Sequence, residues 1–232
     1  VVTASAVADE MATADGTRVW ITPGSDFASQ RWGGKIDPVT PGLTDRATVA
    51  RELIPLGTDG AADVVSEVER RVAENTLAAA AVAPLARLMG VDTVIARNDI
   101  EFERYATARP DDVTERLDAA DLTRAWTGPV VAHDQALVDE QSFGGVPGIG
   151  DQPQRAVWAV DGTPAVVSVR SGATAALQGS AATLVALAEQ GLVEGTEVLV
   201  EVDSDDGVAI DVDWSIIGDS NRYEDRRWYS VG

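Results

Sequence analysis

The sequence contains no cysteine and a single histidine, His133, among its 232 residues. Without thiols, disulfides, cysteine-based zinc sites and thiolate nucleophiles are excluded. The histidine lies next to Asp134, and no serine occupies a GxSxG turn, so a Ser-His-Asp triad is not in place. Walker, Rossmann and zinc-protease motifs are also missing. The sequence therefore offers no obvious reaction centre and predicts no catalytic residue.

Basic residues are scarce, with 18 lysines and arginines against 38 acidic residues and a formal net charge of -20. This charge repels a phosphate backbone, so we expect no nucleic acid partner. The most apolar run, residues 77–89, contains Pro84 and Arg87 and is shorter than the ~20 apolar residues of a membrane helix. The start at Val1 shows neither an initiating Met nor a signal peptide, which suggests a piece of a longer protein.

The 45% hydrophobic content is sufficient for a packed core, and its clearest pattern lies in residues 85–101. These residues pass from helical spacing through Gly90, expected in the left-handed conformation, into an apolar strand. The strand ends at Arg97, Asn98 and Asp99, where an α/β sheet often presents polar groups. We expect this stretch to form the centre of an N-terminal lobe.

The remaining pattern predicts an α/β fold, a mixed β-sheet flanked by helices with a smaller C-terminal α+β lobe ending in a β-hairpin. The expected elements are a strand at 18–22, helices at 61–75, 110–121 and 181–190, and a hairpin of strands 156–160 and 165–169. We expect an N-terminal α/β lobe at 1–142, a Gly/Pro-rich linker or lid at 143–154, and a C-terminal lobe at 155–232.

The terminal hairpin is expected to turn at residues 205–207, which places Val198 opposite Trp214. The same register places Glu201 opposite Asp211. Like charges at opposed positions are unfavourable unless the face is solvated or a cation is bound. Glu201 and Asp211 are therefore weak metal candidates, although the sequence has no EF-hand spacing and a solvent-facing acidic surface is the simpler interpretation.

Two groups of polar residues, at 97–99 and 219–222, follow predicted strands. Their side chains can hydrogen-bond to sugar hydroxyls or to an anionic group. Six of the twelve aromatic residues are tryptophans, which could include a sugar-stacking platform. The glycan-binding candidates are Arg97, Asn98, Asp99, Trp32, Asp219, Asn221 and Arg222. The alternative is that the polar residues pair with one another and cap the strand ends.

Four blocks, in order along the chain, carry a resemblance to a known family. They are VWITPGSDFASQRWG, PLARLMGVDTVIARNDIE followed by TARP, LVALAEQGLVEGTEVLV, and GDSNRYEDRRW. Together they resemble the extracytoplasmic part of actinobacterial α-(1→3)-arabinofuranosyltransferases. Matching positions are Pro23, Gly24, Phe27, Trp32, Gly90, Val91, Arg97, Asn98, Asp99, Asp219, Ser220, Asn221, Arg222 and Arg227. In the last block, Tyr223, Glu224 and Asp225 interrupt the arginine run that is typical of the family.

The resemblance implies a soluble piece of a large polytopic C-type glycosyltransferase on the extracytoplasmic face of the cell membrane. Such enzymes build cell-wall arabinan, in arabinogalactan and lipoarabinomannan, from decaprenylphosphoryl-arabinose as donor. The implied partners are a cell-wall glycan acceptor and the membrane-embedded portion of the same polypeptide. The catalytic acid is expected outside this segment, and no cofactor is expected within it.

We therefore expect a domain that positions the acceptor glycan or scaffolds the catalytic membrane part. A purely structural protein-interaction module is the first alternative. A stand-alone glycan hydrolase is the second, and it would need two carboxylates facing each other across a cleft.

Overall fold

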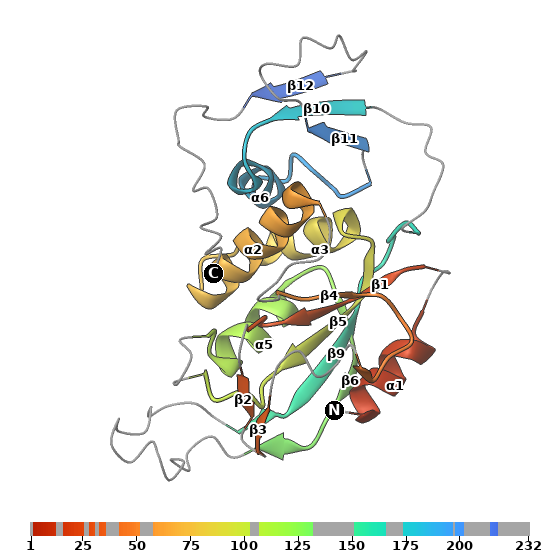
Figure 1. The fold of residues 1–232 in the computed structure, drawn as a ribbon, viewed down its shortest axis with the longest axis vertical. Coiled ribbons are helices and arrows are strands. Elements are labelled where there is room, and N and C mark those ends of the chain that lie inside the picture. Colours follow the sequence, from red (N-terminus) through yellow and green to blue (C-terminus); the bar gives the residue numbers. More distant parts are fainter. Residues whose placement is uncertain are drawn as a thin grey trace, which may run out of the picture.

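The computed structural model describes residues 2–12, 16–25, 28–30, 33–35, 42–51, 58–102, 107–131, 151–165, 174–196, 198–201 and 214–217. The larger layer is built around a five-stranded sheet. Figure 1 shows a smaller layer, containing α6, stacked beyond α2 and α3. Among the described residues, no helix has the length and apolar character needed to cross a membrane. The predicted α/β class is confirmed.

The five-stranded sheet is mixed, as expected, and has the order β4-β1-β5-β9-β6. Strands β4, β1 and β5 are parallel, and β9 runs antiparallel to both β5 and β6. The strands are β1 (Arg18–Thr22), β4 (Thr48–Val49), β5 (Val91–Arg97), β6 (Thr123–Thr127) and β9 (Arg155–Ala159). Two short antiparallel pairs lie outside it, β2 (Ala28–Gln30) with β3 (Gly33–Lys35) and β7 (Val130–Val131) with β8 (Gln152–Pro153).

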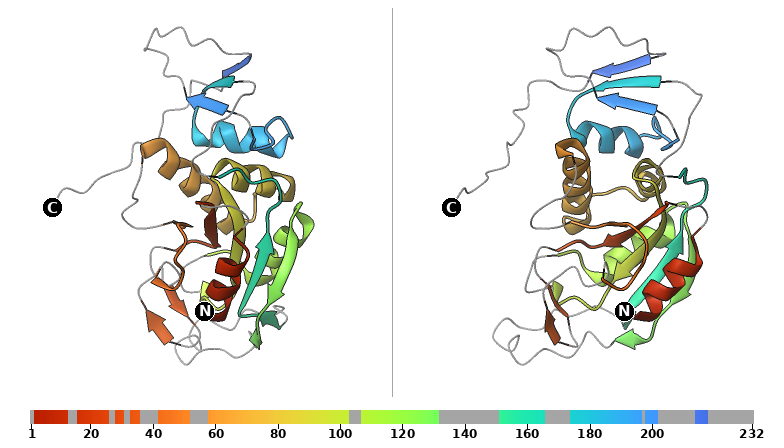
Figure 2. Two further views of the ribbon diagram at one scale, coloured as in Figure 1. Left: turned by 90° about the vertical axis from the view of Figure 1, so that its right-hand side faces the viewer. Right: turned by 45° about the vertical axis from the view of Figure 1, so that its right-hand side comes forward.

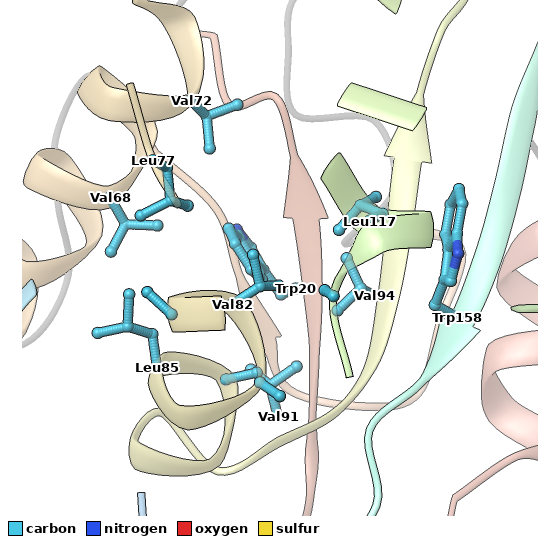
Figure 3. Packing of buried hydrophobic residues seen from close by; sticks show 14 of the residues in the cluster. Trp20, Val68, Val72, Leu77, Val82, Leu85, Val91, Val94, Leu117 and Trp158 are labelled. Carbon is cyan, nitrogen blue, oxygen red and sulfur yellow. The ribbon is translucent and has the colours of Figure 1, made fainter. Parts of the chain in front are cut away.

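Helices cover both faces of this sheet, so alternate strand residues are buried on opposite sides. On one face, Trp20 and Val94 pack with residues of α2 (Asp59–Ala73), α3 (Ala79–Leu88) and α5 (Pro110–Ala119) (Figure 3). On the other face, Ile21 and Ile95 pack against α1 (Val2–Glu10). Burial on both faces explains why β5 is apolar along most of its length.

The predicted helix-glycine-strand unit at the centre is confirmed. Helix α3 ends at Leu88, Gly90 has a φ of 69°, and every residue of β5 is buried. A positive φ costs glycine little, so the chain can reverse here within two residues. The backbone amide of Arg18 then donates to the Gly90 carbonyl at 2.8 Å, which anchors β1 beside β5.

The smaller layer has a three-stranded parallel sheet in the order β11-β10-β12, with α6 (Ala181–Glu189) between it and helices α2 and α3 (Figure 2). Its strands are β10 (Thr174–Gln178), β11 (Val198–Glu201) and β12 (Trp214–Ile217). The predicted terminal hairpin is wrong at its base, because Val198 pairs with Thr174 and Trp214 with Ala175. Strand β10 lies between the two strands expected to pair.

This pairing removes the basis of the metal hypothesis. Glu201 pairs in register with Leu177, and Asp211 lies outside the described residues. Parallel neighbours also require a crossover connection, which the two-fold alternation of apolar residues cannot reveal. The weak metal candidates Glu201 and Asp211 therefore have no observed juxtaposition.

A second predicted hairpin is also wrong. Strand β9 has both edges occupied, by β5 and by β6, so it cannot pair with residues after the turn at Asp161. Residues 166–170 lie outside the described part of the chain. A lobe beginning at Arg155 would contribute its first strand to the N-terminal sheet, and the division into lobes stays a prediction.

An ion pair attaches α6 to the larger layer. Arg71 of α2 contacts Glu189 of α6 with 2.7 Å between Nη1 and Oε2, and the Ala78 amide donates to the other oxygen at 3.2 Å. The side chains are 18% and 19% exposed, so water screens them only in part. The pair therefore helps to fix the smaller layer against the larger one.

A double-mutant cycle of Arg71→Ala and Glu189→Ala is expected to give a coupling free energy of up to about 1 kcal/mol. The measurement is urea unfolding of the four proteins. The matched control is the more exposed pair Arg109–Asp111, separated by 3.3 Å, which should couple by about 0.2 kcal/mol. Zero coupling between Arg71 and Glu189 would show that this pair does not hold α6.

Candidate functional site

The sequence candidates at the end of β5 lie in a buried group of polar side chains near the carboxyl ends of β1 and β5. We call this group the polar cluster, and its members are Gln30, Arg97, Asn98, Asp99, Glu101 and Arg155. Their exposed fractions range from 0% for Asn98 to 8% for Glu101. Polar groups this deep are stable only when other groups compensate their charge and hydrogen-bonding capacity.

Backbone pairing brings the members together from three separate segments. Arg97, the last residue of β5, lies directly opposite Arg155, the first residue of β9. The backbone N–H of Asn98 donates to the backbone carbonyl of Gln154 at 3.0 Å. An antiparallel bridge joins Gln30 of β2 to Ile100. The first two of the four blocks noted in the sequence therefore meet at this edge of the sheet.

A buried ion pair lies within the cluster. Arg155 Nη2 is 3.3 Å from Asp99 Oδ2, and each side chain is 2% exposed. Burying a single charge away from water is costly. When two opposite charges are buried together, their attraction offsets part of this desolvation cost. The pair thus makes the strand ends of β5 and β9 depend on each other.

The side-chain amide of Asn98 links the polar cluster to α5. Its Nδ2 donates to Thr114 Oγ1 at 3.2 Å, so the turn after β5 is attached to the first half of that helix. Arg97, Asn98 and Asp99 are all at most 2% exposed. Their burial favours the alternative of residues that stabilise the strand end, and the glycan contact predicted for them stays a prediction.

The other glycan-binding candidates are not placed. Trp32, Asp219, Asn221 and Arg222 lie outside the described residues. The structure therefore places three of the seven candidates in the polar cluster, as consecutive residues at the end of β5.

Glu69 is a buried acid that helical periodicity assigns to the solvent side of α2. Its carboxylate accepts from Trp20 Nε1 at 2.7 Å, Thr22 Oγ1 at 3.3 Å and the Gly24 amide at 2.7 Å. These bonds attach α2 to the end of β1 and the turn that follows. The available sequence signal is Trp20, a buried indole that needs an acceptor for its N–H.

Burial raises the pKa of the Glu69 carboxyl above its ordinary 4.5, although the bonds from Gly24, Trp20 and Thr22 oppose this rise. A raised pKa in the folded state favours folding below pH 4.5, and this advantage is lost as the pH rises through the raised value. The unfolding free energy of the wild type minus that of Glu69→Gln should therefore decrease with rising pH. Urea unfolding of both proteins at a series of pH values, from below 4.5 to neutral, measures this difference in unfolding free energy.

The control for this prediction is Glu67→Gln. Burial alone would raise the pKa of Glu67, but bonds to Arg70 and Arg71 lower it overall below 4.5. The stabilisation from Glu67 is therefore present above pH 4.5 and lost as the pH falls through the lowered value. A pH-independent difference for Glu69→Gln, or one with the slope of Glu67→Gln, would contradict the assignment.

An open hollow of about 580 Å³ lies beside α5 and β8. Its polar lining comes from one helix face and from β8, namely Asp111, Thr114, Glu115, Asp118 and Gln152. Asp118 also accepts from Trp158 Nε1 at 3.1 Å and pairs with Arg124, which lies 5.0 Å from the Trp158 ring centroid. Carboxylate, hydroxyl and amide groups together can bond to sugar hydroxyls. In the described part of the chain, no three acidic or histidine residues are placed to hold a metal ion.

The comparison with protein families gives a match over nearly the whole chain. The matching model is described as "Alpha-(1->3)-arabinofuranosyltransferase, N-terminal GT-C domain" and covers residues 3–231. Two curated relatives carry the same enzyme name. The one from Mycobacterium tuberculosis is 34% identical over 93 residues, 40% of this chain, and the one from Mycolicibacterium smegmatis is 34% identical over 107 residues, 46% of this chain.

Solved structures of arabinofuranosyltransferase AftD from mycobacteria have a similar fold. One has a TM-score of 0.61 at 22% identity and covers 81% of this chain. A second, of a mutant form, has a TM-score of 0.57 at the same identity. The chain spans about 7% of each curated relative and 14% of each of these two structures. The resemblance thus concerns one small part of much longer proteins.

Proposed function

The chain belongs to the α-(1→3)-arabinofuranosyltransferase family, and on this premise we propose that it is a scaffolding domain of a membrane arabinofuranosyltransferase that acts in cell-wall arabinan synthesis. The observation that carries the scaffolding role is the burial of the polar cluster. The complete enzyme transfers arabinofuranose from decaprenylphosphoryl-arabinose to a glycan acceptor. The domain lies on the extracytoplasmic face and packs against the membrane-embedded portion of the polypeptide.

Burial supports scaffolding because a glycan binds to groups that it can reach. Asp99 and Arg155 neutralise each other inside the sheet, and Asn98 bonds to α5. These interactions make the strand ends rigid, which is what a domain needs to hold larger parts in a fixed relation. Transfer chemistry then takes place elsewhere in the enzyme.

The scaffolding role is tested by arabinofuranosyl transfer to an arabinan oligosaccharide. The full-length enzyme containing this chain should transfer sugar from the polyprenyl-linked donor, whereas the isolated chain should transfer none. Transfer by the isolated chain would place the catalytic residues within it and contradict the proposal.

A second candidate role is acceptor positioning, and the hollow on α5 favours it. This hollow is open to solvent and presents Thr114 and Gln152 as donors beside three carboxylates. Neutral sugar hydroxyls can both donate to carboxylates and accept from these groups. An anionic ligand would instead be repelled.

Titration of the ¹⁵N-labelled chain with arabinan oligosaccharides tests acceptor positioning. We expect amide shifts at Thr114 and Gln152, with Thr114→Val and Gln152→Leu weakening the binding. Gln190→Leu is the control, because this exposed residue caps α6 and does not line the hollow. If no amide shifts at saturating oligosaccharide, this role is excluded and scaffolding alone remains.

A further inference from the structure

Two buried side-chain amides in the polar cluster have hydrogen-bonding atoms without partners in the described part of the chain. Gln30 is 1% exposed, and neither its Oε1 nor its Nε2 makes a hydrogen bond there. Asn98 is 0% exposed, and its Oδ1 is likewise unpaired, although its Nδ2 bonds to Thr114. Buried amides without partners are rare because burial removes their bonds to bulk water.

The two amides come from segments that the fold holds side by side. The bridge between Gln30 and Ile100 places β2 next to the turn that contains Asn98. Thr107, just before α5, has a buried hydroxyl that is also unpaired among the described residues. This place is the carboxyl end of parallel strands β1 and β5, the edge at which open α/β sheets bind ligands.

The chemistry of Gln30 defines the group that would complete it. A primary amide presents a carbonyl acceptor and an N–H donor side by side. A carboxylate can accept from the N–H but cannot donate to the carbonyl, and an ammonium group can only donate. A hydroxyl group can do both.

We propose that Gln30 and Asn98 form an internal binding site for a trapped water molecule. Water fits the closure of the site, since both side chains are at most 1% exposed and buried waters typically make about three bonds to otherwise unsatisfied groups. A trapped water would be present in this chain whatever the complete enzyme does.

The first test is the stability of Gln30→Met, which keeps the length of the side chain but removes both polar atoms. If a water molecule is bound, the unfolding equilibrium constant of this variant should be about five- to tenfold higher than that of the wild type, because the hydrogen bonds between Gln30 and the water are lost. Gln190→Met is the matched control at an exposed position and should change this constant by less than about twofold. A Gln30→Met variant as stable as the wild type, or more stable, would overturn the proposal.

The second test uses the wild-type chain and does not depend on any variant folding. Nuclear Overhauser spectra of the ¹⁵N-labelled protein should show cross-peaks from water to the Gln30 side-chain amide protons. Addition of methyl α-arabinofuranoside should leave these cross-peaks unchanged, because the site is closed to a sugar. Replacement of the peaks by sugar protons, a cross-peak to a protein side chain instead, or no cross-peak to water would overturn the proposal.

Discussion

Replacing Asp99 by alanine is expected to destabilise the chain by about 3 to 5 kcal/mol, because it removes the carboxylate opposite a buried arginine. Arg155 is 2% exposed, so its guanidinium would stay buried without the Asp99 carboxylate. The measurement is the unfolding free energy in urea, followed by tryptophan fluorescence. A loss below about 1 kcal/mol would be typical of a surface pair and would contradict the buried geometry.

Two further variants separate the ion pair from general damage. The double variant Asp99→Leu with Arg155→Met removes both charges of the pair and should lose less stability than Asp99→Ala alone, since neither partner is left buried without the other. The control is Asp111→Ala, whose partner Arg109 is 36% exposed. It should cost less than about 1 kcal/mol.

Gly195→Ala is expected to destabilise the chain by about 2 to 4 kcal/mol, through backbone strain together with overpacking. Gly195 has a φ of 88°, and an added Cβ would collide with the Pro84 carbonyl oxygen and lie 2.6 Å from Arg87 Cβ. The segment after α6 rests directly on α3 at this point, where Arg87 Nη1 also donates to the Glu194 carbonyl at 3.3 Å. Urea unfolding measures the loss.

Gly191→Ala is the matched control for this close approach. Gly191 also has a positive φ, 69°, but an added Cβ there would meet nothing within 4 Å. Its substitution should therefore cost only the backbone strain, about 1 kcal/mol. Equal losses for Gly191→Ala and Gly195→Ala would show that the segment after α6 is not seated on α3.

Local patterns were sufficient for the centre of the fold. Helix α3, Gly90 and strand β5 follow from helical spacing, a glycine stop and an apolar run, all of which act over a few residues. Helix α2 follows from its valines in the same way. Strand β1 was predicted with the bounds that the structure shows.

The strand order could not be predicted, because it depends on which segments meet across long stretches of chain. Alternating apolar residues occur both in a hairpin strand and in a strand separated from its sequence neighbour by β10. For β9, the nearly continuous apolar run was a usable signal of a strand buried on both faces, which the hairpin interpretation missed.

The candidate site was predicted in part. The sequence predicts Arg97, Asn98 and Asp99 as polar residues at a strand end, and the structure places them there. Arg155, the partner of Asp99, is 56 residues away and is brought close only by the register of β5 and β9. The depth of the cluster is likewise a tertiary property, since it depends on β2 and α5 packing over the strand end.

The central claim is that the polar cluster maintains the domain and takes no part in sugar transfer. The most direct test is arabinofuranosyl transfer per folded molecule, measured on the full-length enzyme carrying the double variant Asp99→Leu with Arg155→Met. We predict transfer within about twofold of the wild-type rate, because the two side chains pair with each other and are each only 2% exposed. A variant that unfolds at the wild-type urea concentration yet loses transfer by more than about tenfold would contradict the claim.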